Sequence, residues 1–233
     1  MIDIGSTNFL IRVPSLPKLE FKEYSTTLFD TWVKEVETSL AIEDFSIFLE
    51  IEEGSIKGRG KILAAAGALY LGIGQYGDFM SGVDTIKTQV SAAGSTLIEQ
   101  ACSPFGGAGV ATKSRKYGGT LSRLRTLFDK VQRRQLTVDQ AMLEIDVLFD
   151  NEVNDTDGFL EKIREELECA PLLPEQLNWL DDAEEDFEIE TLSEPKKPKK
   201  KSIPMIAIPS QRYRVEIWRE SKKGEKQIKI VEL

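Results

Sequence analysis

The side chains that enzymes most often use for acid–base and nucleophilic chemistry are sparse in this sequence. Its 233 residues include no histidine, which excludes an imidazole base, a Ser-His-Asp triad and an HExxH metal site within this chain. Cys102 and Cys169 lie far apart and form no CxxC pair, so we expect neither a thiolate zinc site nor a disulfide framework. We therefore expect a cytoplasmic protein that is not an enzyme and that holds no cofactor or metal. The sequence points to no small-molecule substrate.

One glycine motif resembles a nucleotide-binding fingerprint. Gly72, Gly74 and Gly77 fit the pattern GxGxxG. That fingerprint needs a buried strand before it, a helix after it and an acidic residue about 20 residues further on. Glu99 has the right spacing, but the alanine-rich segment before Gly72 favours a helix over a strand. We expect no dinucleotide site here.

Two other patterns fall short of catalytic sites. A Walker A loop is excluded because Ser55 replaces its first glycine and Ile62 replaces its magnesium-binding hydroxyl. Glu50 and Glu52 alternate with apolar residues along a predicted strand, which is typical of a polar strand face. A metal-dependent nuclease would need acidic residues from separate elements to converge, and spacing alone does not show convergence.

Charge is divided sharply along the chain. The formal net charge of −9 combines −17 over residues 1–194 with +8 over residues 195–233. Residues 151–194 hold 16 acidic and 2 basic side chains, whereas residues 55–140 hold 12 basic and 5 acidic ones. Such blocks indicate association with a partner or mutual neutralisation, and they do not define a fold.

Two lysine-rich segments are candidates for contact with nucleic acid or with an acidic partner. One is the segment of residues 103–120, which we expect to be a flexible loop. The other is the proline-bearing sequence PKKPKKK, which we interpret first as an extended linker and alternatively as a targeting signal or a phosphate-contacting arm. The candidate residues are Lys113, Arg115, Lys116, Lys196, Lys197, Lys199, Lys200 and Lys201.

Small residues concentrate in one segment, because fourteen of the 17 glycines lie between Gly54 and Gly119. Residues 62–74 contain no charge, and small residues at i, i+4 spacing predict a helix that packs closely in a hairpin with residues 83–101. This hairpin would mediate self-association or, if residues 62–83 insert, membrane contact, although the run is short for a bilayer. The residues expected to make this contact are Gly60, Ala64, Ala68, Leu69, Leu71, Gly72 and Ile73.

The remaining pattern predicts an α+β fold. It consists of an N-terminal strand–helix–strand unit, the Gly/Ala-rich helical hairpin, further α-helices and a C-terminal β-hairpin. The expected strands are residues 8–13, 45–51, 203–208, 212–219 and 227–233, and the expected helices are residues 27–40, 121–131, 137–148, 156–168 and 172–180.

These elements suggest five segments along the chain. They are an N-terminal unit (1–54), the glycine-rich hairpin with a flexible loop (55–119), a helical segment (120–170), an acidic then basic linker (171–202) and the β-hairpin (203–233). The leading hypothesis is an interaction or assembly protein that forms homo-oligomers or recruits a protein partner. The alternatives are a membrane-active protein of the bacterial effector type and a nucleic-acid accessory factor.

Overall fold

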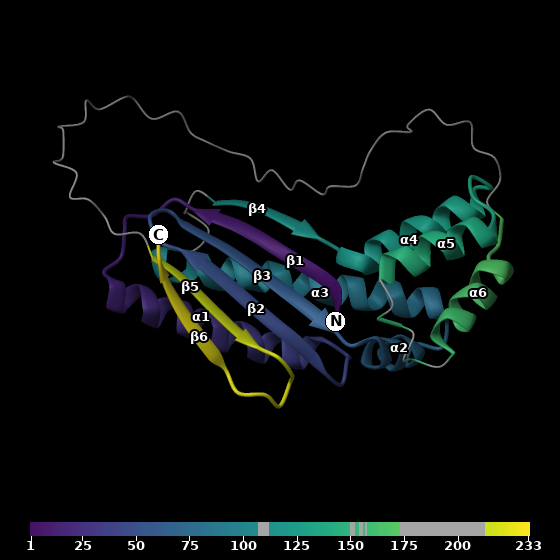
Figure 1. Cartoon of the computed structure of the whole chain (residues 1–233). Helices are drawn as coiled ribbons and strands as arrows, with labels where there is room; N and C mark the ends of the chain where they lie inside the picture. Colours follow the sequence, from purple (N-terminus) through teal and green to yellow (C-terminus); the bar gives the residue numbers. More distant parts are fainter. Residues whose placement is uncertain (107–111, 150–151, 154–155, 157, 173–212) are drawn as a thin grey trace, which may run out of the picture.

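The fold is built around one antiparallel sheet. The computed structural model describes residues 1–106, 112–149, 152–153, 156, 158–172 and 213–233. Their six strands lie in the order β4-β1-β3-β2-β5-β6 (Figure 1). The strands are β1 (Ile2–Ile11), β2 (Phe45–Glu52), β3 (Ile56–Ala64), β4 (Thr112–Tyr117), β5 (Tyr213–Arg219) and β6 (Gln227–Glu232). The helices are α1 (Lys18–Ser39), α2 (Ala66–Gly74), α3 (Phe79–Cys102), the 3-10 turn η1 (Ser103–Phe105), α4 (Gly119–Gln132), α5 (Val138–Phe149) and α6 (Phe159–Cys169).

Helices α1 and α3 cover the same face of the sheet (Figure 1). Apart from the short helix α2 between β3 and α3, the chain runs β1-α1-β2-β3-α3-β4, and β1 and β3 lie at the centre of the first four strands. This is the split β-α-β arrangement. The C-terminal hairpin adds β5 and β6 beside β2. A lone hairpin is marginally stable in water, and pairing with β2 gives it the sheet it requires.

The core fills the space between this sheet and its two long helices. Leu49 and Ile217 point into it from β2 and β5 and are completely buried. Trp32 of α1 lies among them, and its indole Nε1 donates a hydrogen bond to the Ala93 carbonyl of α3 at 3.0 Å. This bond satisfies the one polar atom of a large buried ring and connects the two helices. The apolar stripe that predicted the first helix is therefore the face that α1 buries.

The α+β class, the N-terminal strand–helix–strand unit and the C-terminal hairpin are confirmed. Helix α1 begins at Lys18, earlier than expected, because Pro17 stands in the N-cap position, where it leaves no amide hydrogen unpaired. Strands from the three predicted segments 1–54, 55–119 and 203–233 pair in one sheet.

The prediction of one continuous helix through Gly60 and Gly72 is wrong. Residues up to Ala64 form β3, and a separate short helix, α2, begins at Ala66. A Cβ at Gly60 would lie 2.5 Å from Leu97 Cδ2 and 2.7 Å from a ring carbon of Trp32, so the helices pack directly on this strand. Gly58 and Gly60 are thus buried members of a period-2 strand pattern. The hairpin that α2 forms with α3 is confirmed, although its first helix, α2, is shorter than predicted.

The expectation of a flexible loop over residues 103–120 is also wrong for its second half. Residues 112–117 form the edge strand β4, which pairs with β1 from Ser6↔Tyr117 to Ile11↔Thr112. Three of its six residues are lysine or arginine, so its sequence shows no apolar alternation. Backbone pairing with β1 decides its conformation.

Helices α4, α5 and α6 gather at one end of the sheet, beside α2 (Figure 1). The expected capping box is confirmed, since Gln140 N donates to Thr137 Oγ1 at 3.2 Å and Thr137 N donates to Gln140 Oε1 at 3.0 Å. Within the part of the chain that the structure describes, none of the helices combines the length and apolar character needed to cross a bilayer. The predicted helix 172–180, apart from Leu172, and the predicted strand 203–208 lie outside the described residues.

Candidate anion-binding face

The face of the sheet opposite α1 and α3 is the open face, and its side chains are mostly polar or charged. Strand alternation places residues that pair across strands on the same face. The pairing registers connect the open-face residues into three rows across all six strands. From β4 to β6 these rows are Tyr117, Ser6, Lys61, Phe48, Trp218, Gln227; then Arg115, Asn8, Arg59, Glu50, Glu216, Lys229; then Lys113, Leu10, Lys57, Glu52, Arg214, Val231.

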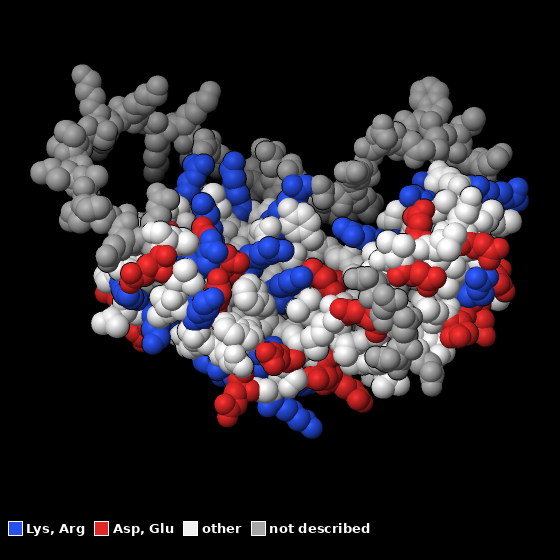
Figure 2. All heavy atoms as spheres, in the orientation of Figure 1, with Lys and Arg blue, Asp and Glu red and all other residues white. Residues whose placement is uncertain are grey.

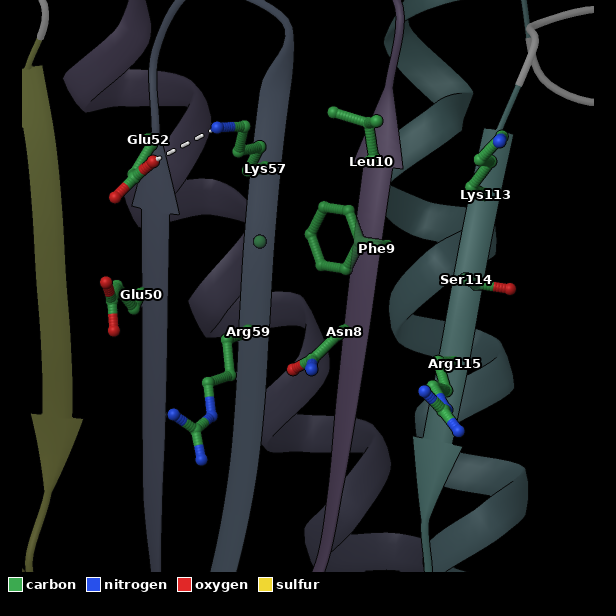
Figure 3. Close-up of a pocket in the computed structure, with 11 residues that line it drawn as sticks. Asn8, Phe9, Leu10, Glu50, Glu52, Lys57, Arg59, Lys113, Ser114 and Arg115 are labelled. Carbon is green, nitrogen blue, oxygen red and sulfur yellow. Dashed lines mark ion pairs between the residues drawn. The ribbon is translucent and has the colours of Figure 1, made fainter. Parts of the chain in front are cut away.

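A groove runs along β1 between two columns of basic side chains. Lys57 and Arg59 on β3 and Lys113 and Arg115 on β4 line the groove (Figure 3). Lys61 continues the β3 column beyond the groove. The groove has a volume of about 530 Å³ and is lined by residues of β1, β2, β3 and β4. Since neighbouring strands lie about 4.8 Å apart, the two columns are separated by roughly 10 Å. A groove of that width accommodates one extended ligand strand.

The floor of the groove is uncharged. Asn8 and Leu10 of β1 lie between the two basic columns, and Asn8 points toward β3 (Figure 3). The Asn8 Oδ1 atom is enclosed and accepts no hydrogen bond from the described residues. Beneath this floor the Phe9 ring occupies the space that a side chain at position 58 would need, because a Cβ there would lie 2.0 Å from Phe9 Cζ. Gly58 therefore lets an aromatic ring of the core support the groove.

Charges in the groove are mostly basic and incompletely paired. Arg59 and Lys113 form no ion pair with any described residue. Lys57 Nζ lies 3.9 Å from Glu52, and Lys61 Nζ lies 3.1 Å from Asp3. Figure 2 shows the blue side chains gathered over this part of the open face. We call the open-face side chains of β4, β1 and β3 the cationic half.

The open-face side chains of β2, β5 and β6 form the paired half, in which charges of opposite sign meet. The Arg214 guanidinium contacts Glu50 at 3.1 Å and Glu52 at 2.5 Å, and Lys229 lies 4.0 Å from Glu216. The hydrogen bonds that Arg214 donates to Glu52 are the main cause that raises the pKa of Arg214. Glu50 and Glu52 thus form a polar strand face, as predicted, with Arg214 as their counter-ion.

Only part of the predicted anion-contact set lies on the open face. Lys113 and Arg115 do, with the Arg115 guanidinium 5.2 Å from the centre of the Tyr117 ring. Lys116 points to the opposite face, where its amine donates to Ser95 Oγ of α3 and burial lowers its pKa. The five lysines between 196 and 201 lie outside the described residues.

Sequence reasoning did not assign Lys57, Arg59 and Lys61 to a binding site. They precede the uncharged run of residues 62–74. The available signal was their alternation with Gly58 and Gly60, which marks a strand whose buried positions are glycine.

The residues predicted for self-association are divided between two elements. Gly60 and Ala64 lie on β3, whereas Ala68, Leu69, Leu71, Gly72 and Ile73 lie on α2. A Cβ at Gly72 would lie 3.0 Å from the Ala41 carbonyl oxygen, so this close approach is used within one chain. Leu71, with 59% of its surface exposed, is the one large apolar side chain of the set that faces solvent. Self-association stays a prediction.

The remaining motifs lack the structural context that their chemistry requires. The first two glycines of the GxGxxG segment, Gly72 and Gly74, lie at the end of helix α2, and no strand precedes the segment directly, so the dinucleotide fingerprint is not formed. Among the described residues, no three cysteine or acidic side chains are placed to hold a metal ion. No protein-family model, curated protein or solved structure matches this chain.

Proposed function

We propose that this protein is a non-enzymatic binding protein whose open sheet face receives a negatively charged partner. The observation that supports this most directly is the pair of basic columns on β3 and β4, with the uncharged floor of β1 between them. A chain with a net charge of −9 concentrates basic side chains on one exposed surface. Repulsion between them costs stability, and an anionic ligand would offset that cost.

The contrast between the two halves favours a binding role over a structural one. Basic residues that serve only the sheet are expected to meet acidic partners, as Arg214 does with Glu50 and Glu52. Arg59 and Lys113 have no such partner among the described residues. Both are exposed and therefore accessible to a ligand.

The experiment is retention of the full chain on immobilised heparin in a rising salt gradient. The variant Lys57→Gln/Arg59→Gln/Lys113→Gln should elute at clearly lower salt. The salt dependence of log K should fall by about one for each phosphate-like contact removed. The matched control is Lys22→Gln/Lys34→Gln/Lys223→Gln, which removes three exposed basic side chains outside the groove and should elute close to the unmodified protein.

A third variant separates the groove from the other basic segment of the sequence. It replaces the five lysines between 196 and 201 with glutamine. Retention that depends on these five lysines and is unchanged in the strand triple variant contradicts the proposal. Passage of the unmodified protein through the column at low salt contradicts it as well.

A further inference from the structure

We propose that the anionic ligand of the open face is a single-stranded nucleic acid, with its phosphates along the basic column of β3 and its bases against Phe48 and Trp218. This inference rests on the proposed function and adds the chemical class of the ligand. It follows from the one row of the open face that contains aromatic residues.

That row runs from the cationic half directly into an aromatic pair. Lys61 of β3 pairs with Phe48 of β2, and Phe48 pairs with Trp218 of β5. Both rings are partly exposed and lie on the polar face of the sheet, outside the core that α1 and α3 cover. At about 4.8 Å between strands, Phe48 is one strand spacing and Trp218 two from the column that contains Lys61. A nucleotide bridges such a distance between its phosphate and its base.

Aromatic rings beside a basic groove are the combination that single-stranded nucleic acids require. Every base has a flat π face that stacks on an aromatic side chain, while the backbone follows the positive charge. Along β3 the basic residues recur at every second position, about 6.6 Å apart, which is comparable with the spacing of successive phosphates in an extended strand. At the far end of the same row, Tyr117 is exposed on β4 and provides a third ring.

Duplexes and acidic proteins fit this surface less well. The bases of a duplex are stacked on each other, so their faces are unavailable to Phe48 and Trp218, and a broad sheet face does not enter a groove as one helix or ribbon does. An acidic peptide would satisfy Arg59 and Lys113 but would give the two rings nothing to stack on. The rings therefore discriminate between these ligands.

The test compares four fluorescently labelled probes by anisotropy with the full chain. They are a 15-residue oligothymidylate, an abasic deoxyribose phosphate strand of the same length, a 15-base-pair duplex and a polyglutamate of similar charge. We expect the oligothymidylate to bind at least about 10-fold more tightly than the other three at equal salt, because only its bases are free to stack.

Ring substitutions identify where the bases lie. Phe48→Ala and Trp218→Ala should each weaken oligothymidylate binding by roughly 5- to 100-fold and leave binding of the abasic strand unchanged. Phe48→Tyr and Trp218→Phe keep a stacking surface and should retain most of the affinity. A cross-strand aromatic pair also stabilises a sheet. Thermal melting followed by circular dichroism therefore checks that each variant is folded. The comparison of the four probes uses the unmodified protein and does not depend on any variant.

A spectroscopic signal provides an independent readout. In a Trp179→Phe background the remaining indoles are Trp32, which is buried, and Trp218. Oligothymidylate should quench the tryptophan fluorescence of the Trp179→Phe variant. In the double variant Trp179→Phe/Trp218→Phe the quenching should disappear while binding persists.

The possible outcomes separate the two proposals. Equal binding of the abasic strand or the duplex, with no effect of ring removal, overturns the stacking inference and leaves anion binding intact. Preference for polyglutamate assigns the face to an acidic protein and also overturns the inference. If none of the four probes binds at low salt, the proposed function fails together with it.

Discussion

The two halves of the open face lie on one sheet and share one core, yet they use charge in different ways. In the paired half, Glu50, Glu52 and Glu216 each lie within 4.0 Å of Arg214 or Lys229. In the cationic half, Arg59 and Lys113 form no ion pair with described residues. Figure 2 shows blue side chains over the strands near β4.

The difference separates charges that complete the sheet from charges that remain available to a ligand. Arg214 connects the C-terminal hairpin to β2, because it lies on β5 and contacts two glutamates of the neighbouring strand. Arg59 also lies on the open face, on β3, and contributes no ion pair among the described residues. Similar residue types thus have different roles according to the strands beside them.

The largest effect that we expect concerns the packing under the cationic half. Gly58→Ala should lower the free energy of unfolding by about 1–3 kcal/mol, because the new methyl group overlaps the Phe9 ring in a well-packed core. Chemical denaturation measures this change. The control is Gly74→Ala, where nothing lies within 4 Å of the added Cβ, and its unfolding free energy should change little or rise slightly. Equal stability of the Gly58→Ala variant and the unmodified protein would show that the ring and the strand adjust freely.

A smaller effect tests the charge difference between the halves. Arg214→Ala should lower Tm by about 2–5 °C, since it leaves Glu50 and Glu52 without their shared counter-ion. Arg59→Ala should leave Tm nearly unchanged, because surface substitutions away from specific contacts have small effects. Thermal melting of both variants by circular dichroism is the measurement. A loss of stability in Arg59→Ala as large as that in Arg214→Ala contradicts the division into two halves.

The smallest effect tests the direction of individual side chains on β4. Lys113→Gln should weaken binding to heparin or oligothymidylate by roughly 3- to 10-fold at low salt, because it removes one anion contact. Lys116→Gln should leave this affinity unchanged, since Lys116 points to the helix-covered face and contacts Ser95. Titration of each variant at two salt concentrations gives both the affinity and its salt dependence. Equal losses in the two variants indicate that general charge, and not the open face, governs binding.

Local pattern was sufficient for the elements in which apolar side chains mark the buried positions. Strand β2 alternates Phe45, Ile47, Leu49 and Ile51 with less buried residues, and helix α4 shows an apolar stripe, so both were predicted close to their observed bounds. Strand β3 was missed because its central buried positions are Gly58 and Gly60, which have no apolar side chain to reveal the period. The apolar run after it then suggested one longer helix.

The sequence by itself determined the α+β class, the amphipathic helices, the C-terminal hairpin and the absence of imidazole chemistry in this chain. Each of these depends on residue type or on short-range periodicity. The tertiary structure alone decided the candidate site. Lys57 and Lys113 are separated by 55 intervening residues, and they flank Leu10 only because β3 and β4 both pair with β1. The same pairing turns Lys116 away from the groove, because side chains alternate along a strand, and the one-residue step from Arg115 to Lys116 reverses the face.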